Sequence, residues 1–169
     1  MMKEIQIAQK EFGILDRFPE GVCLLREDFS VLFWNRSLEA WTEIARSDIL
    51  GKDIGIYFPH LHQPKYAHRL MQIFEGGPPT IFSSQLHKSI IPCQMPDGRW
   101  RIQHTTVTAI PEPDLIFDSQ VQEYQKRFYA LLVIEDVTDL TYRIQDYRAM
   151  RDRALEEISE RKKIEEALR

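Results

Sequence analysis

Residues that could carry catalytic or metal chemistry are few in this chain, and they form no known constellation. There is no Gly-rich phosphate loop, no Gly-x-Ser-x-Gly and no His-Glu-x-x-His. The two cysteines, Cys23 and Cys93, lie far apart without the spacing of metal ligands, and we interpret them as buried, reduced thiols. We therefore predict no enzymatic activity, no catalytic residue and no metal site in this segment.

Aromatic residues offer a different chemistry, the binding of an apolar small molecule. Aromatic side chains line many ligand pockets, but they also fill ordinary hydrophobic cores, and both interpretations stay open here. The candidate pocket residues are Trp34, Trp41, Tyr57, Tyr66 and Leu70, with Phe58 and Phe74 beside them. Nothing in the sequence identifies the ligand.

Composition excludes several classes of protein. The 169 residues are 43% hydrophobic and 28% charged, with a net charge of −4, so no basic surface predicts nucleic-acid binding. No apolar run approaches the roughly 20 residues of a membrane span, and the N-terminus has no signal-peptide core. We expect a cytoplasmic segment without a membrane span, and a span after residue 169 stays open.

The first half of the chain predicts a hairpin followed by helices. Ile5, Ala8, Phe12 and Leu15 have helical spacing, which predicts an amphipathic helix over residues 3–16. Two apolar runs at 22–25 and 31–34 flank a polar turn and predict a β-hairpin. Asn35 is then a candidate N-cap for a helix that carries Leu38, Trp41 and Ile44. One further helical turn should end at Gly51.

The second half predicts one helix and three strands. A helix over 63–75 is stopped by Gly76-Gly77-Pro78-Pro79. Strands are predicted at 80–87, 100–110 and 128–137, with a turn at 96–99 and a long exposed loop at 111–127. The predicted fold class is α+β, a five-stranded antiparallel sheet with helices on one face.

Residues 137–169 contain neither Gly nor Pro, which predicts one long helix of about 48 Å. This length exceeds the diameter of about 35 Å expected for the rest of the chain, so part of the helix should protrude. Leu140, Ile144, Tyr147, Ala154 and Ile158 form an apolar stripe that Arg151 interrupts. The stripe predicts an imperfect coiled coil in a homodimer, or packing against the same molecule.

The two ends of the domain supply the predicted dimer contacts. We assign Ile5 and Phe12 from the first helix and Leu140 and Ile144 from the last. For the first helix, a role in simply covering the sheet is an equal alternative. At the start of the last helix, Asp136 and Thr138 are candidate caps, and we predict that these two residues relay a signal from strand to helix.

Several short motifs follow one another in a fixed order. The first half carries Pro19–Val22, Trp34-Asn35, Leu38, Trp41-Thr42 and Ile49–Lys52, and the second half carries Asp97–Trp100, Glu135–Thr138, Glu160–Lys162 and Glu165–Arg169. In this order and spacing, residues 14–169 resemble the PAS domain family and the linker that follows it. The segment 111–127 is longer than is usual between the last two strands of the family.

The resemblance implies a sensory and dimerisation module. It divides the chain into an N-terminal amphipathic helix (1–18), a PAS domain (19–137) and a linker helix (138–169) to an output domain in cis. The implied function is a sensor of a bacterial signalling protein of the histidine kinase (two-component) or diguanylate cyclase type, whose catalytic activity lies after residue 169. The alternative is a ligand-free dimerisation module that only positions its neighbours.

The resemblance also bears on cofactors. The position of the haem-binding histidine of some PAS domains falls at Tyr66, and His68 lies on a different face of that helix. His60, His62 and His68 are therefore interpreted as ordinary polar side chains, and a haem sensor ranks third. Flavin ranks last, because the cysteine-containing motif of light-sensing relatives is missing from Tyr57–His62. We assign no cofactor and leave an unidentified small molecule open.

Overall fold

A computed structural model of the chain describes residues 1–112 and 127–168. The loop predicted at 111–127 thus lies almost entirely outside the described residues. Within them the chain forms two compact units, Met1–Asp136 and Val137–Arg169.

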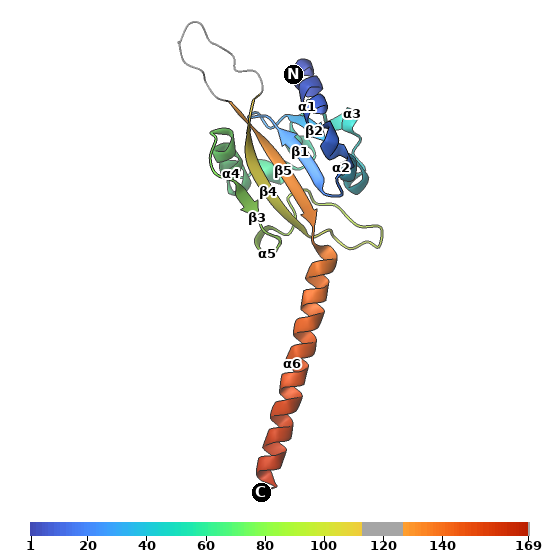
Figure 1. Ribbon diagram of the computed structural model, residues 1–169, viewed down its shortest axis with the longest axis vertical. Coiled ribbons are helices and arrows are strands. Elements are labelled where there is room, and N and C mark those ends of the chain that lie inside the picture. Colours follow the sequence, from blue (N-terminus) through green and yellow to red (C-terminus); the bar gives the residue numbers. More distant parts are fainter. Residues whose placement is uncertain (113–126, 169) are drawn as a thin grey trace. The chain divides into compact units, whose positions relative to one another are not determined.

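The first unit is built on a five-stranded antiparallel sheet with the strand order β2-β1-β5-β4-β3 (Figure 1). The five strands are β1 (Gly21–Leu25), β2 (Val31–Trp34), β3 (Thr80–Phe82), β4 (Gln103–Pro111) and β5 (Phe128–Asp136). The predicted α+β class, the first hairpin and the antiparallel sheet are confirmed. Strand β5 lies in the centre, where it pairs with β1 on one side and with β4 on the other.

One face of the sheet carries the main core. It is covered by α2 (Arg36–Thr42), α3 (Arg46–Ile49), α4 (Pro64–Phe74) and two 3-10 turns, Ile54–Ile56 and Pro59–His62. Alternate strand residues point into this core, including Cys23, Leu25, Val107, Leu132 and Ile134. The predicted helix at 63–75 is confirmed, and so is the Gly51 turn, where φ is +76°.

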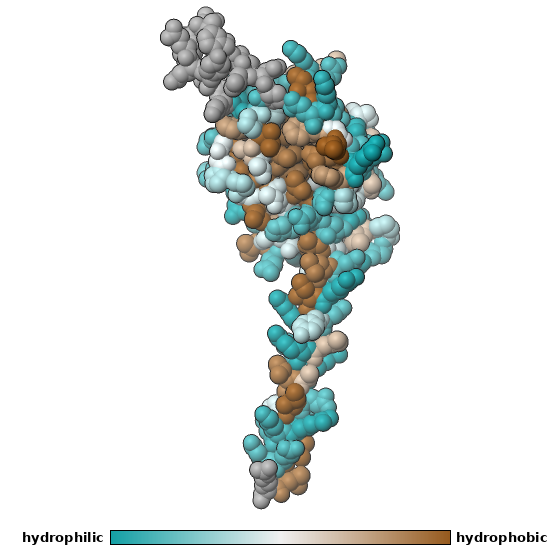
Figure 2. Space-filling model, in the orientation of Figure 1, coloured by the Kyte–Doolittle hydropathy of each residue, from teal (hydrophilic) through white to brown (hydrophobic). Residues whose placement is uncertain are grey.

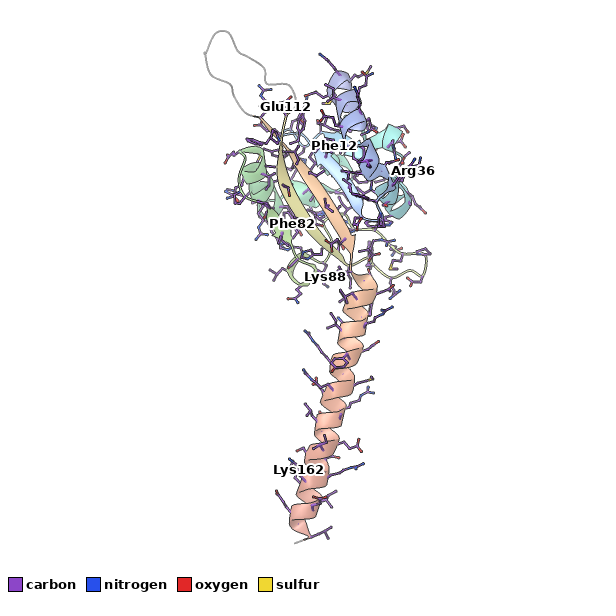
Figure 3. The ribbon with its side chains drawn as sticks, in the orientation of Figure 1. Phe12, Arg36, Phe82, Lys88, Glu112 and Lys162 are labelled. Atoms are coloured by element: carbon purple, nitrogen blue, oxygen red, sulfur yellow. The ribbon has the colours of Figure 1, made fainter. Side chains whose placement is uncertain are left out.

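The opposite face of the sheet is covered in part by α1 (Met2–Glu11) and a 3-10 turn at Gly13–Arg17. Ala8 is buried there, and Ile5 and Phe12 are half-buried against a second cluster of strand residues. Phe12 lies between α1 and the sheet, with its ring 6.3 Å from that of Phe33 (Figure 3). The first helix therefore covers the sheet. Its predicted part in a dimer stays a prediction.

The part of this face beside α1 is apolar and open. A shallow groove of about 450 Å³ runs between the 3-10 turn and β5, and its walls include Leu15, Phe18, Leu131 and Val133. Figure 2 shows apolar side chains gathered on this side of the first unit. Phe18 is 46% exposed, whereas Leu131 and Val133 are half-buried.

Two predicted elements differ from those observed. The strand predicted at 80–87 ends at Phe82, because Ser83 accepts a hydrogen bond from the Leu86 amide and begins a helical turn, α5 (Ser84–His87). The strand predicted to start at residue 100 starts at Gln103. Residues before it are hydrogen-bonded back to an earlier loop, as the contact from the Arg101 amide to the Cys93 carbonyl (3.0 Å) shows.

The second unit is one helix, α6 (Thr138–Ala167), which confirms the long helix predicted from the sequence. Its N-cap position is Val137, so neither of the two candidate caps, Asp136 and Thr138, occupies the N-cap position predicted for it. Apolar side chains lie exposed along it, among them Leu140 (58%) and Ile144 (43%) (Figure 2). None of the helices in the described residues is long and apolar enough to cross a membrane.

Candidate functional site

Most of the predicted pocket residues are in the main core. Trp34 and Leu70 are fully buried, and Tyr66 is 8% exposed. The ring of Trp34 stacks on Phe58 at 6.4 Å, and that of Tyr66 on Phe82 at 5.8 Å. Tyr57 is half-buried at the edge, where its hydroxyl donates to the Asp48 carbonyl. These side chains pack against protein, and a role in ligand binding stays a prediction for them.

Trp41 lies instead on an open groove. The helix that carries it ends at Thr42, because Glu43 adopts the left-handed conformation with φ of 59°, so Ile44 lies outside the helix on which the sequence placed it. Trp41 and Ile44 are both half-buried, in contrast to the fully buried Leu38. Trp41 thus packs at the edge of the main core and also lines the groove, and its role in ligand binding stays a prediction.

This groove, the α2 groove, has a volume of about 810 Å³ and lies between the end of α2 and the segment that precedes β4. It is lined by Ala40, Trp41, Thr42, Glu43, Ile44, Phe58, Pro92, Cys93, Gln94, Met95, Pro96, Trp100 and Arg101. Its size is within the range of small-molecule sites. Trp100 is 60% exposed, which is unusual for so large an apolar side chain.

Arg101 is the largely buried charged group of the α2 groove. Its guanidinium lies over the Trp41 ring, 4.5 Å from the ring centre, in cation–π geometry. The same guanidinium forms an ion pair with Asp136, the last residue of β5. Its side chain is only 11% exposed, and its Nε is buried without a hydrogen-bond partner. Arg101 thus connects the groove wall to the end of the central strand.

Gln103 holds the segment that leads into the far wall of the α2 groove, and its Nε2 donates to the sulfur of Cys93 in that wall at 3.6 Å. Its side-chain oxygen accepts hydrogen bonds from the Ile90 and Ile91 amides at 3.1 and 3.0 Å, and its Nε2 donates to the Ile91 carbonyl at 2.6 Å. The Gln103 amide also donates to the Lys88 carbonyl, at the end of β4 opposite Glu112 (Figure 3). The first residue of β4 therefore holds residues 88–91 in place.

The two cysteines are buried, reduced thiols, as the sequence predicts. Both are buried, and neither forms a disulfide. Burial raises the pKa of the Cys23 thiol far above its usual value, and burial also raises that of Cys93. Because the thiolate is the reactive form, neither residue is suited to nucleophilic or redox chemistry.

The histidines do not converge. The His60 ring contacts the Ile90 carbonyl at 3.0 Å, His62 pairs with Asp53 at 2.9 Å, and His68 is exposed. In the described part of the chain, no group of three or more His, Cys, Asp or Glu side chains is arranged to hold a metal ion. Tyr66, the position that the haem alternative uses, has its ring stacked against Phe82 and edged by His60 and His87.

A second cavity, of about 400 Å³, lies at the other end of the sheet near Glu112. Its central cation, Arg26, is already bound by two carboxylates, Glu4 at 3.0 Å and Asp28. Arg26 holds the pKa of Asp28 well below its usual range, so this ion pair persists in mildly acidic solution. The lining also includes a second cation, Arg127, but it holds four carboxylates, Glu4, Glu27, Asp28 and Glu112. This cavity therefore favours an incoming anion less than the α2 groove does.

Sequence reasoning missed Arg101 and Gln103 as site residues. The role of Arg101 could not be predicted from local sequence, because its partner Asp136 lies 35 residues further along the chain. The neighbouring turn was visible, since Asp97-Gly98-Arg99 predicts it, and Gly98 indeed has φ of 82°. Of the predicted relay residues, Asp136 is the partner of Arg101 and Thr138 is buried. The relay role itself stays a prediction.

Comparison with known proteins gives a family match. The family model described as PAS fold matches residues 15–117, more than half of the chain. None of the curated proteins matches the sequence.

Several solved structures share the fold. The PAS domain of BvgS from Bordetella pertussis superposes with a TM-score of 0.55 at 14% identity, covering 86% of this chain and 98% of that one. A sensory box sensor histidine kinase from Vibrio cholerae gives 0.51 at 19% identity, covering 81% and 95%. A domain of a sensory box sensor histidine kinase/response regulator from Geobacter sulfurreducens gives 0.50 at 12% identity, covering 77% and 94%. At these identities the likeness concerns the fold.

Proposed function

This chain belongs to the PAS fold family, and from that premise we propose that it is the sensory module of a bacterial signal-transduction protein. The observation that carries the proposal is the direct passage from the central strand β5 into α6, a helix of 30 residues. The output domain would follow in cis and be of the histidine kinase or diguanylate cyclase type. The similar folds from Vibrio cholerae and Geobacter sulfurreducens come from sensor histidine kinases, which supports the first of these.

The relay would run through the last residues of β5. Asp136 ends the strand and Thr138 begins the helix, with neither Gly nor Pro between them. A stiff connection passes on a displacement that a flexible linker would dissipate. The ion pair of Asp136 with Arg101 supports the proposal, because it ties the end of the strand to the groove wall.

We expect the charge-removing substitution Asp136→Asn to reduce the stimulus-dependent change in output of the full-length protein by about threefold or more, while the domain stays folded. Partly exposed ion pairs contribute only about 1 kcal/mol to stability, so a loss of signalling would not reflect unfolding. The measurement is output activity with and without stimulus, beside a melting curve. Asp97→Asn is the matched control, because Asp97 pairs with Arg99 in an exposed turn. An undiminished response in folded Asp136→Asn would contradict the relay.

Dimerisation is the second part of the proposal. The exposed apolar side chains of α6, Leu140 and Ile144 among them, are suited to helix–helix packing with a second copy. Ile5 and Phe12 contribute only their exposed portions, since each is half-buried against its own sheet. Signalling would then change the arrangement of the two copies.

We expect the double substitution Leu140→Glu with Ile144→Glu to raise the dimer dissociation constant by about tenfold or more, because each places a charge in an apolar helix seam. Analytical ultracentrifugation of the whole chain over a concentration series measures this. The control Gln145→Glu with Ser159→Glu adds the same charge at polar positions of α6. If the wild-type chain is monomeric at high micromolar concentration, or if both variants behave alike, the helix seam is not the dimer contact.

The alternative function is a ligand-free dimerisation module. The packed rings of Trp34, Phe58 and Tyr66 favour it, because they fill the space between sheet and helices. The two functions differ in whether a small molecule raises the melting temperature of the purified chain. The haem alternative predicts a Soret band in the absorbance spectrum of haem-supplied protein.

A further inference from the structure

The α2 groove contains one charged group whose hydrogen-bonding capacity is unfilled. Arg101 is largely buried, and its Nε has no partner, while its terminal nitrogen is paired with Asp136. Buried donors without partners are rare in folded proteins, because each has lost its water without replacement. The forked guanidinium is shaped to bind a carboxylate through two parallel hydrogen bonds. The group that would complete this site is therefore an anion.

The rest of the groove is suited to a flat apolar group. Two indoles line it, the half-buried Trp41 and the 60% exposed Trp100. Ile44, Met95 and Pro96 add apolar surface around them. A planar ring that packs on the face of an indole removes apolar surface of both groups from water, which favours binding. Apolar side chains outnumber the two charged ones in this lining, so the ligand should combine a flat apolar part with a charged group.

The surroundings of the two charged side chains in the groove decide whether the ligand should be an anion or a cation. Arg101 and Glu43 are the two charged side chains among the groove residues. Glu43 lies exposed at the end of α2, where water solvates its carboxylate, whereas Arg101 is withdrawn from water. A ligand gains more by pairing with a partly desolvated charge than with one that is fully hydrated.

We propose that the α2 groove binds a planar aromatic carboxylate, with its ring against the indoles of Trp41 and Trp100 and its carboxylate on the guanidinium of Arg101. The inference rests on the proposed sensory function for its consequence: a bound carboxylate competes with Asp136 for Arg101, at the last residue of β5. Binding itself is a property of the groove alone.

The test follows the three indole N–H signals of the isotopically labelled chain by NMR during a titration with 1-naphthoate. The signals are assigned with single Trp→Phe variants. We expect saturable shifts of the Trp41 and Trp100 signals at concentrations up to about 5 mM, in the affinity range of an unoptimised small ligand. The Trp34 signal serves as the internal reference, because this side chain is fully buried and does not line the groove.

Matched probes and variants separate the charge from the ring. The neutral 1-naphthamide should bind about tenfold or more weakly than 1-naphthoate, and Arg101→Gln should lower naphthoate affinity by a similar factor. Arg69→Gln is the control, because it removes another guanidinium that lies over a ring, that of Phe82, outside the groove. If Arg101→Gln does not fold, Trp100→Ala replaces it, since this exposed side chain can be truncated without loss of the fold; we expect about tenfold weaker binding.

Four results would each overturn the proposal. They are no saturable shift with naphthoate, shifts that spare Trp41 and Trp100, equal affinity for the amide, and tighter binding of phenyltrimethylammonium, a cation suited to Glu43 and the indoles. The titration uses residues 1–169 and measures binding alone. A negative result therefore removes this ligand class and leaves the relay through α6 standing, whereas failure of the Asp136→Asn test removes the relay and leaves the binding site standing.

Discussion

Replacing Asn35 with alanine should lower the free energy of unfolding by about 3–5 kcal/mol, the largest effect that we expect from a polar residue in this chain. The Asn35 side chain is fully buried. Its oxygen accepts from the Val22 and Leu38 amides at 2.9 and 3.2 Å, and its nitrogen donates to the Leu15 and Glu20 carbonyls at 3.2 and 2.8 Å. Alanine would leave four backbone groups without these partners.

Urea unfolding followed by circular dichroism measures the effect, with Ser83→Ala as the control. Ser83 also caps a helix, but its contact with the Leu86 amide is exposed and 3.4 Å long, so we expect a loss below about 1 kcal/mol. A comparable loss in both variants would show that Asn35 acts only as a cap. The three long-range contacts, to Val22, Leu15 and Glu20, would then contribute little.

The variant Asn35→Asp adds a test by pH. It keeps the two acceptor contacts but points a carboxylate at two carbonyl oxygens, which together with burial should raise its pKa in the folded state above the unfolded value of about 3.9. The folded state then binds more protons than the unfolded state between these two pKa values. The stability of the variant relative to wild type should therefore fall as pH rises through that window, from about pH 4 upward. A pH-independent difference would contradict this account.

The second large effect concerns Gln103, for which Gln103→Leu should cost about 2–4 kcal/mol. Leucine has a similar volume, so the loss would come from hydrogen bonds and not from a cavity. It would leave the buried Ile90 and Ile91 amides without their acceptor. It would also remove the donor to the Ile91 carbonyl.

Denaturant unfolding measures the Gln103→Leu effect against Gln94→Leu, which makes the same substitution at an exposed position nearby. Because Gln103 holds the segment that leads into the wall of the α2 groove, its loss should also broaden the Trp100 indole signal. Equal stability of the two variants would mean that solvent replaces Gln103 and that residues 90–93 are held in another way.

Most of the secondary structure could be predicted from the sequence, because it depends on patterns among neighbouring residues. The apolar runs of β1 and β2, the apolar stripe of α4 and the uninterrupted α6 are properties of neighbouring residues. The Asn35 cap is likewise local, since its acceptor contact reaches the Leu38 amide three residues on. The one capping error, at α6, arose because polar residues flank Val137, and the sequence does not show which of three neighbours becomes the N-cap.

The candidate site was predicted less well, and the reason is distance along the chain. Trp41 has the spacing of a core residue, but its helix ends at Thr42, and its ring faces Arg101 from the other half of the chain. The short β3 shows the same limit, because Ser83 begins a helical turn where β propensity favoured a longer strand.

By itself the sequence determined the α+β class, the hairpin, the long C-terminal helix and the family resemblance. Each of these depends on periodicity, capping residues or motif order, which can be observed among residues close together in the sequence. Only the tertiary structure decided which polar groups meet. The sheet order places β5 between β1 and β4, so that Cys23 lies opposite Leu132 and Gln103 opposite Asp136. Asn35 gains its partners at Leu15 and Glu20, and Arg101 gains Trp41 and Asp136, through that arrangement. Contacts between segments that are distant along the chain depend on the packing of the whole sheet, so a local sequence pattern does not predict them.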